Sequence, residues 1–186
     1  MSGKIILLDG ESSSGKSTLA RGLQARLVLP FWHFSIDHLV AAEVLPKARI
    51  QSGEFRMHDL RQPFFDGFHR CVPALAEAGN NLLVEHIVET EEWLLRLLRL
   101  IGHLDVFTVR VRCPLPELER RERARGDRRI GEAREDYESA REFGIHDIDV
   151  DSTCALDRNV DTVIKAWTNR QPPCAFAKRA QSVVSI

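Results

Sequence analysis

The sequence of 186 residues, with a mass of 21.1 kDa, is long enough for one compact domain with a buried core. Hydrophobic residues make up 44% and charged residues 28%, a globular composition that excludes collagen-like and low-complexity chains. The 26 Lys and Arg residues are balanced by 27 Asp and Glu residues, so we expect no nucleic-acid partner, which would require a basic surplus.

The N-terminal segment and the longer apolar segments bear on the location of the protein. The first ten residues contain a short apolar run without a small-residue cleavage site, so we do not predict a signal peptide. No stretch approaches the roughly 20 apolar residues of a membrane-spanning helix, so we expect no membrane partner. These features predict a cytoplasmic protein.

Apolar and amphipathic segments alternate along the chain. Segments typical of strands lie at residues 4–9, 31–36, 81–88, 104–113 and 145–150, and the first of them is a short apolar run typical of a buried parallel strand. Segments typical of helices lie at residues 16–27, 38–45, 59–78, 91–101 and 156–167, with a further charged helix after Pro116. This alternation predicts an α/β fold with a mostly parallel sheet.

No repeat or linker divides the chain, so we predict a single domain over residues 1–170. Residues 171–186 are expected to form a loose C-terminal tail. Residues 47–58 look polar and irregular, and Pro63 and Pro73 are expected to start or kink segments within the helical stretch that follows.

Residues 10–17 read Gly-Glu-Ser-Ser-Ser-Gly-Lys-Ser and match the phosphate-binding pattern G-x-x-x-x-G-K-[ST]. They lie between the first predicted strand and the first predicted helix. The glycines allow a tight turn whose N–H groups face one concavity, and the helix directs its positive end towards the same phosphates. The nucleotide-binding residues predicted here are Gly10, Glu11, Ser12, Ser13, Ser14, Gly15, Lys16, Ser17 and Thr18.

Within this loop, Lys16 is expected to contact the β/γ-phosphates and the Ser17 hydroxyl to bind Mg²⁺. The guanine-binding pattern Asn-Lys-x-Asp is absent, which favours ATP over GTP. The chain is also too short for the helical lid domain of a larger ATP-driven machine. Length and element order therefore favour a small kinase of the nucleotide-kinase type.

Two carboxylates follow predicted strands, at the edge of the sheet where α/β folds bind ligands. Asp37 follows the second predicted strand and either accepts a proton from an acceptor hydroxyl or caps the next helix. Glu85 ends the apolar run of the third strand and is predicted to hold Mg²⁺ through water or to position the acceptor. The neighbouring His86 either binds substrate or has a structural role.

Residues 120–129 contain six arginines and two acids, directly after the fourth predicted strand. This composition predicts a lid over ATP at about residues 120–135, since arginine stays charged and binds phosphate through two parallel hydrogen bonds. We predict that Arg125 and Arg128 bind phosphate, with Arg121 as a further candidate. The alternative is a solvated helix face with ion pairs four residues apart.

Taken in order, these features resemble the chloramphenicol phosphotransferase family of P-loop kinases. The matching stretches are Ile-Leu-Leu-Asp-Gly at 6–10, Ser-Ser-Ser-Gly-Lys-Ser at 12–17, Phe-Ser-Ile-Asp-His-Leu at 34–39, and residues 104–113, 121–128 and 147–153. The most specific is the Arg-Gly-Asp-Arg lid sequence after a strand that ends in Val-Arg-Cys.

The resemblance implies a nucleotide-kinase-like, three-layer α/β fold with a five-stranded parallel sheet. It also implies transfer of the ATP γ-phosphoryl group, with Mg²⁺, to a primary hydroxyl of chloramphenicol. By this resemblance Asp37 is the catalytic base, Lys16 and Ser17 contact nucleotide and metal, and Arg125 and Arg128 belong to the lid.

The sequence departs from the family pattern in two places. The third strand ends in Glu85-His86, where the family tends to have two adjacent acids, and residues 47–66 match poorly. The latter segment contains several cations, which would suit a phosphorylated or carboxylated acceptor, namely Arg49, Arg56, His58 and Arg61.

These departures leave alternatives open. The cationic segment would suit a nucleotide or nucleoside kinase, or a zeta-toxin-like sugar-nucleotide kinase. A non-catalytic ATP-binding switch is a further alternative. Shikimate-type and gluconate-type kinases are disfavoured, since the chain lacks the Gly-Gly pair of their substrate loop. In each catalytic case the partner is a small molecule with a hydroxyl acceptor.

Overall fold

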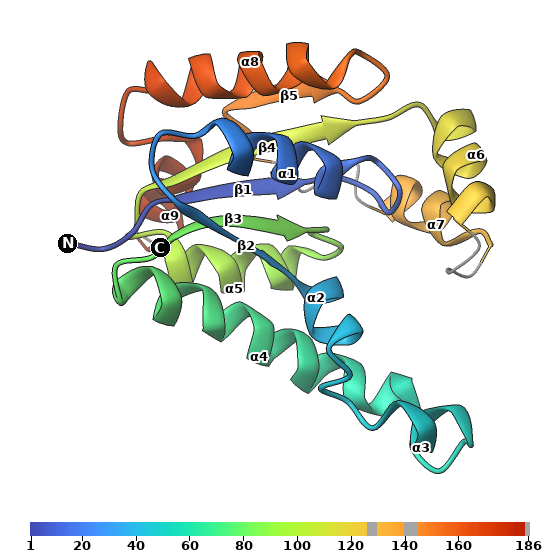
Figure 1. Ribbon diagram of the computed structural model, residues 1–186. Helices are drawn as coiled ribbons and strands as arrows, with labels where there is room; N and C mark the ends of the chain where they lie inside the picture. The colour runs from blue at the N-terminus through green and yellow to red at the C-terminus, as the bar shows by residue number, and fades with distance from the viewer. Residues whose placement is uncertain (126–129, 140–144, 185–186) are drawn as a thin grey trace.

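The structure, a computed structural model, describes residues 1–125, 130–139 and 145–184 (Figure 1). The strands are β1 (Ile5–Asp9), β2 (Phe31–Ser35), β3 (Asn81–His86), β4 (Val106–Arg112) and β5 (Ile148–Asp151). The helices are α1 (Lys16–Arg26), α2 (Ile36–Ala41), α3 (Lys47–Gln51), α4 (Met57–Glu77), α5 (Glu91–Ile101), α6 (Leu115–Arg125), α7 (Glu132–Ser139), α8 (Leu156–Thr168) and α9 (Ala175–Val184).

The five strands form one parallel sheet in the order β2-β3-β1-β4-β5, which confirms the predicted sheet. The central strand β1 is buried along its whole length, as its unbroken apolar run predicts. After β1 the chain builds one half of the sheet with β2 and β3, and then crosses to the other half with β4 and β5. The carboxyl end of β1 is therefore a topological switch point, where open α/β sheets bind their ligands.

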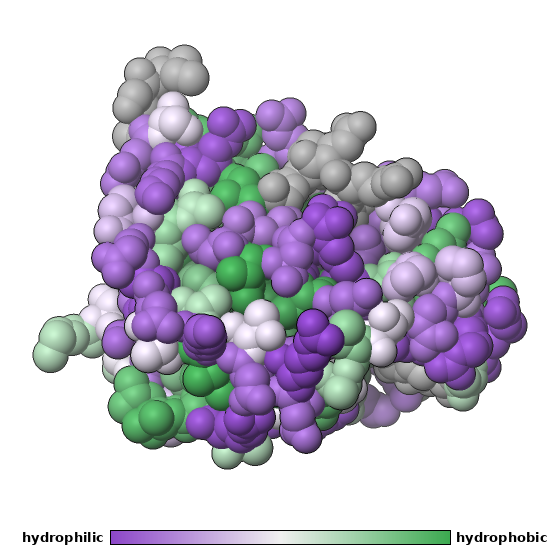
Figure 2. Space-filling model, turned by 90° about the horizontal axis from the view of Figure 1, so that it is seen from above, coloured by the Kyte–Doolittle hydropathy of each residue, from purple (hydrophilic) through white to green (hydrophobic). Residues whose placement is uncertain are grey.

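Helices cover both faces of the sheet, so the fold has the three layers that the family resemblance implied (Figure 1). Side chains of β1 alternate between the two faces, because successive residues of a strand point in opposite directions. Ile6 and Leu8 pack towards α1 and α8, whereas Ile5 and Leu7 pack towards α4, α5 and α9. Seen from the side of α8, the surface is mostly hydrophilic, with apolar side chains in separate patches (Figure 2). In the described part of the chain, no helix combines the length and apolar character needed to cross a membrane.

The expectation of a loose tail after Gln171 is wrong. Most of this segment forms α9, whose Phe176 is 1% exposed and packs in the core beside α5. The Asp147 side chain holds the start of the helix, since its Oδ1 accepts a hydrogen bond of 2.8 Å from the backbone N–H of Ala175. Phe176, Ala180 and Val183 recur at helical spacing and pack in or against this core, so the sequence did carry a pattern for the helix.

The prolines of α4 do not start new segments, which was one of the two outcomes expected of them. One helix of 21 residues runs through both Pro63 and Pro73. Each proline removes a helical hydrogen bond, but Phe68, Val72 and Ala76 lie on one face and are buried against the rest of the core. Tertiary packing therefore outweighs the local cost.

Candidate functional site

The loop between β1 and α1 depends on its two glycines. Gly15 has φ 101°, a left-handed conformation at which a side chain is strained, and it stands immediately before α1. A Cβ on Gly10 would lie 2.5 Å from the carbonyl oxygen of Val111 on the neighbouring strand β4. The backbone can therefore turn tightly from β1 into α1, close beside β4, because both positions lack side chains.

Several polar atoms of this loop are buried and unpaired. The hydroxyls of Ser12, Ser13 and Ser14 and the Oε2 atom of Glu11 have no hydrogen-bond partner among the residues that the structure describes. A buried polar group without a partner costs about 1–3 kcal/mol, so such a cluster is unfavourable unless a ligand completes it. The loop therefore has the shape and the unsatisfied hydrogen-bonding capacity of a phosphate site.

Lys16 is folded back onto the loop, where its Nζ donates to the carbonyl oxygens of Gly10 and Glu11 at 2.6 and 2.8 Å. Burial lowers the pKa of Lys16, and the negative charges of Glu85 and Asp9 act in the opposite direction. Those two carboxylates lie at the carboxyl ends of β3 and β1, so the ammonium group stands at the switch point of the sheet.

Glu85 and Ser17 are brought together from β3 and α1. The Ser17 Oγ donates a hydrogen bond of 2.8 Å to Oε2 of Glu85, which is 4% exposed. The other carboxylate oxygen, Oε1, accepts a hydrogen bond from Nε2 of His33 on β2. Burial raises the pKa of Glu85, but the His33 hydrogen bond and the Lys16 charge outweigh it, so the pKa lies below its usual value. The carboxylate is therefore held in its charged form.

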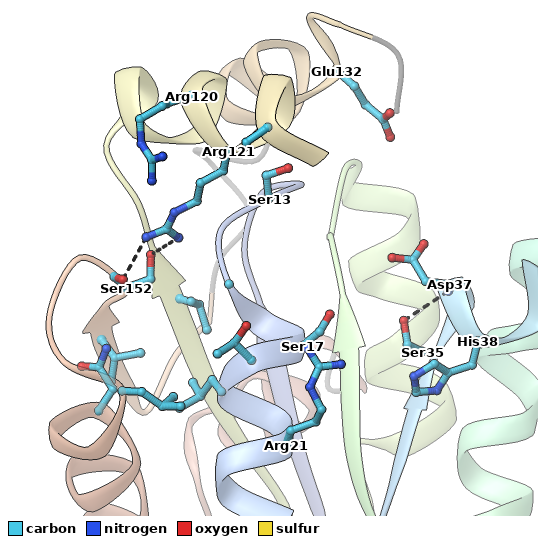
Figure 3. A pocket seen from close by; sticks show the side chains of 18 of the residues that line it. Ser13, Ser17, Arg21, Ser35, Asp37, His38, Arg120, Arg121, Glu132 and Ser152 are labelled. Atoms are coloured by element: carbon cyan, nitrogen blue, oxygen red, sulfur yellow. Dashed lines mark hydrogen bonds between the residues drawn. The ribbon is translucent and has the colours of Figure 1, made fainter. Parts of the chain in front are cut away.

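Asp37 lies in the first turn of α2, at the carboxyl end of β2 (Figure 3). Its backbone N–H donates to the Ser35 Oγ at 3.2 Å, so Ser35 is the residue that caps this helix. The alternative that Asp37 serves as the helix cap is therefore wrong. Its carboxylate lines the space beside the loop (Figure 3).

Two cavities meet at Ser17 and Asp37. The larger, of about 1090 Å³, extends over the loop to α6 and to the turn between β5 and α8, where Arg121, Ser152 and Cys154 line it. The smaller, of about 660 Å³, extends between α2, α4 and the end of β3. Both are lined by Ser17 and Asp37, so a molecule in each would meet at these two side chains.

Arg121 links three parts of the larger cavity. Its guanidinium donates to the Ser14 carbonyl oxygen at 3.2 Å. It also donates to the Oγ and the carbonyl oxygen of Ser152, both at 3.0 Å (Figure 3). Its Nε donates to Glu117 on the same helix at 2.7 Å. Of the three arginines predicted to bind phosphate, this is the one whose side chain the structure describes.

The other two arginines were Arg125 and Arg128. Arg125 is the last residue of α6, and its side chain lies outside the described part of the structure. Arg128 also lies outside the described residues. Their assignment to phosphate therefore remains a prediction.

Residues 3–168 match the model of a family described as chloramphenicol phosphotransferase-like protein. The chain belongs to this family. A protein of Mycobacterium tuberculosis named as a candidate O-phosphotransferase is 29% identical over 170 residues, which cover 81% of this chain and 76% of the relative. Membership of the chloramphenicol phosphotransferase-like family and the fold together indicate an enzyme that transfers phosphate.

Solved structures of small kinases share the fold. The APS kinase of Mycobacterium tuberculosis, in complex with AMPPNP and APS, aligns with a TM-score of 0.67 and 21% identity over 90% of this chain and 99% of that chain. The gluconokinase of Sinorhizobium meliloti 1021 aligns with a TM-score of 0.62 and 15% identity over 98% and 96% of the two chains. The predicted P-loop kinase fold and the family resemblance are both confirmed.

This chloramphenicol phosphotransferase-like protein pairs the cations of its atypical segment with acids. Arg49 forms an ion pair with Glu54, and Arg56 forms one with Asp59. Arg61 donates two hydrogen bonds to Glu89, at 2.6 and 2.7 Å. Of the three arginines in this segment, Arg61 is the one found among the described residues that line the two cavities. Arg49 and Arg56 therefore do not line the two cavities, whereas Arg61 lines the smaller one with its charge paired to Glu89.

Three histidine contacts were not predicted. The Nε2 atoms of His69 and His86 lie 2.8 Å apart, and burial lowers their pKa values to about 4 and about 3, so both rings are neutral at pH 7. His146 contacts Oδ2 of Asp9 through Nε2 at 2.9 Å, and His33 holds Glu85. The partners are far apart in the sequence, and no local pattern connects them. His86 also lines the smaller cavity, so both of its predicted roles remain open.

Proposed function

We propose that the protein transfers the γ-phosphoryl group of ATP, with Mg²⁺, to a hydroxyl of a small molecule in the smaller cavity. The observation that carries this proposal is that Ser17 and Asp37 line both cavities. ATP in the larger cavity, with its phosphates on residues 10–18, would then place its γ-phosphate beside the acceptor. Dependence on ATP is consistent with a cytoplasmic protein.

The AMPPNP in the related APS kinase supports a nucleotide in the larger cavity. Lys16 would contact the β/γ-phosphates after leaving the loop carbonyls that it contacts now. Arg121 would contact the nucleotide from α6, and Arg125 and Arg128 would neutralise the transferring phosphoryl group from the lid.

Ser17 and Glu85 fit the requirements of Mg²⁺. They offer a hydroxyl and a carboxylate oxygen, the ligand types that this ion prefers, and those atoms are 2.8 Å apart. When bound there, Mg²⁺ would supply positive charge against the charge that develops on the transferring phosphoryl group.

Asp37 would accept the proton of the acceptor hydroxyl. The oxygen of that hydroxyl would bond to the γ-phosphorus while the bond between the γ-phosphorus and the leaving oxygen of ADP breaks. The products are a phosphate ester and ADP. Positioning and charge stabilisation account for most of the rate in such transfers, so the placement of Asp37 at the junction of the cavities is the main requirement.

Part of the lining of the smaller cavity is apolar and would suit the apolar body of an acceptor, beside a charged part that includes Asp37, Glu85 and Arg61. The apolar side chains that line it are Ile36, Val40, Met57, Phe64, Phe65 and Ile87. Together with the family description, this makes chloramphenicol the first acceptor to test. The alternative of a nucleotide kinase or a zeta-toxin-like sugar-nucleotide kinase now depends on Arg61, which lines the smaller cavity, because Arg49 and Arg56 line neither cavity.

The test is ADP release by the purified protein with ATP and Mg²⁺ against chloramphenicol, other hydroxylated antibiotics, nucleosides and nucleotides. We expect stimulation by an uncharged hydroxylated compound. Asp37→Asn should lower kcat at least about 100-fold, a typical loss for a general base, and leave ATP binding intact. The control is Asp59→Asn, an exposed carboxylate paired with Arg56.

Two results would overturn the proposal. Stimulation restricted to nucleotides or sugar nucleotides would move the protein to the alternative kinase classes. ATP binding without stimulation by any acceptor, together with full biological activity of a Lys16→Ala protein, would establish a non-catalytic switch.

A further inference from the structure

His33 is buried behind Glu85 on the edge strand β2. Its side chain is 9% exposed, and its Nε2 is hydrogen-bonded to Oε1 of Glu85. Since an ionised carboxylate accepts hydrogen bonds and cannot donate them, His33 is the donor. Among the described residues that line the two cavities, His33 is absent, so it does not contact the space available to ligands.

We infer that His33 is a positioning residue that orients Glu85 for Mg²⁺ and sets Glu85 apart from Asp37. This inference rests on the proposed function, in which Ser17 and Glu85 hold the metal. It assigns to His33 no contact with substrate, nucleotide or metal.

The sheet register places His33 where it can do this. Ser35 stands opposite Glu85 in the parallel pair of β2 and β3, and His33 stands opposite Leu83. Residues two apart on a strand share a face, so His33 and Glu85 are diagonal neighbours on the same face of the sheet. Leu83 packs in the cluster beneath α1, the helix that carries Ser17.

The two oxygens of Glu85 are consequently held from two different elements. Ser17 on α1 occupies Oε2 at 2.8 Å, and His33 on β2 occupies Oε1. A glutamate held at one oxygen can still rotate about its last torsion, which has a broad energy profile. With His33 removed, the carboxylate is free to turn towards the nearby positive charge of Lys16. The proposed metal site would then lose its second protein ligand, the Glu85 carboxylate oxygen that lies beside the Ser17 hydroxyl.

His33 also touches the element that carries Asp37. Its ring meets the ring of His38 edge-on, with centroids 4.5 Å apart and an interplanar angle of 80°. His38 follows Asp37 on α2, so one side chain contacts both the metal-side carboxylate and the acceptor-side helix. In the proposed reaction Glu85 and Asp37 have different tasks, one towards the metal and the other towards the acceptor hydroxyl. His33 keeps the carboxylate of Glu85 beside Ser17, where the metal would bind.

The test compares wild type with His33→Ala, His33→Asn and His33→Gln. Glutamine carries an N–H donor at about the reach of the histidine Nε2, whereas asparagine is one carbon shorter and does not reach Glu85. Mn²⁺ binding to the protein–ATP complex, measured by electron paramagnetic resonance of the free ion, is the readout that does not depend on turnover. kcat and the Mg²⁺ concentration for half-maximal activity are measured alongside, with His58→Gln as the exposed control.

We expect His33→Ala and His33→Asn to weaken Mn²⁺ binding by about 10-fold or more, as loss of a residue that orients a metal ligand does. His33→Gln should retain binding within about threefold, and ATP binding without metal should stay at the wild-type level in all three. If His33→Ala does not fold, the comparison of Asn with Gln decides. Equal Mn²⁺ affinity in both, beside a wild type that binds the metal and transfers phosphate, overturns the inference. A wild type that neither binds Mn²⁺ with ATP nor transfers phosphate refutes the proposed function itself, and the role of His33 with it.

Discussion

The backbone N–H of Ser12, in the loop between β1 and α1, donates a hydrogen bond of 3.0 Å to Oδ2 of Asp136 on α7. A carboxylate thus lies against an amide of the loop that the sequence assigns to phosphate. Burial raises the pKa of Asp136 to about 6, and the negative charges of Glu132 and Glu89 act in the same direction. The hydrogen bond from Ser12 and the charge of Lys16 oppose this rise but do not cancel it.

The first prediction concerns Asp136 and pH. Its folded-state pKa of about 6 lies above the usual 3.8, so the folded protein binds this proton more tightly than the unfolded chain. The resulting stabilisation is complete below about pH 4 and is lost as the pH rises through 6. Asp136→Asn keeps an oxygen acceptor for Ser12 and abolishes the titration. The measured quantity is the melting temperature of the variant minus that of wild type. We expect this difference to be larger at pH 7.5 than at pH 4.5. Equal differences at both pH values, in buffers where Glu138→Gln behaves as wild type, would contradict this.

The second prediction concerns Gly10. Alanine at this position would place its Cβ 2.5 Å from the carbonyl oxygen of Val111, a backbone atom of the central sheet that cannot move aside. We expect Gly10→Ala to lower the free energy of unfolding by about 1–3 kcal/mol, the usual cost of overpacking, and to impair ATP binding. The matched control is Gly67→Ala in α4, where no atom lies within 4 Å of the added Cβ. That change should be neutral or stabilising by up to about 1 kcal/mol. Urea denaturation measures the stability of both variants. A Gly10→Ala protein as stable as wild type would refute the conclusion that position 10 has no room for a side chain.

The third prediction concerns Arg121, whose guanidinium joins the phosphate loop at Ser14 to the turn at Ser152. Arg121→Ala removes these contacts from the wall of the larger cavity. We expect the dissociation constant for ATP, measured by calorimetry, to rise by about 10-fold, equivalent to about 1.4 kcal/mol. Arg123→Ala, an exposed change on the same helix, should leave it unaltered. Identical ATP affinity in the two variants would place the nucleotide elsewhere.

The fourth prediction concerns α9. Phe176 is among the largest fully buried side chains, so Phe176→Ala should lower the free energy of unfolding by about 3–5 kcal/mol. Lys178→Ala, an exposed change two residues further along, should have little effect. Chemical denaturation compares the two. Similar stabilities would mean that the C-terminal segment is a dispensable tail after all.

The sequence alone determined the features that depend on neighbouring residues. The phosphate loop needs glycines, a lysine and a serine at fixed spacing within eight positions, and the structure places it between β1 and α1 as predicted. The five strands were also visible, most clearly β1, which is an apolar run buried along its whole length, as expected of a central parallel strand. The order of these elements was sufficient to indicate the fold and the family.

The tertiary structure alone decided which distant residues meet. Glu85 and His33 are 52 positions apart, and they are neighbours only because β2 and β3 pair at one side of the sheet. His69 and His86 meet because α4 packs on the strand that follows it. Likewise, the sequence does not reveal that the positive charge of Arg61 is paired, because its partner Glu89 is 28 positions away. Composition and spacing report how many charges and apolar groups a chain has, whereas ion pairing, burial and the position of a carboxylate depend on which strands and helices lie side by side.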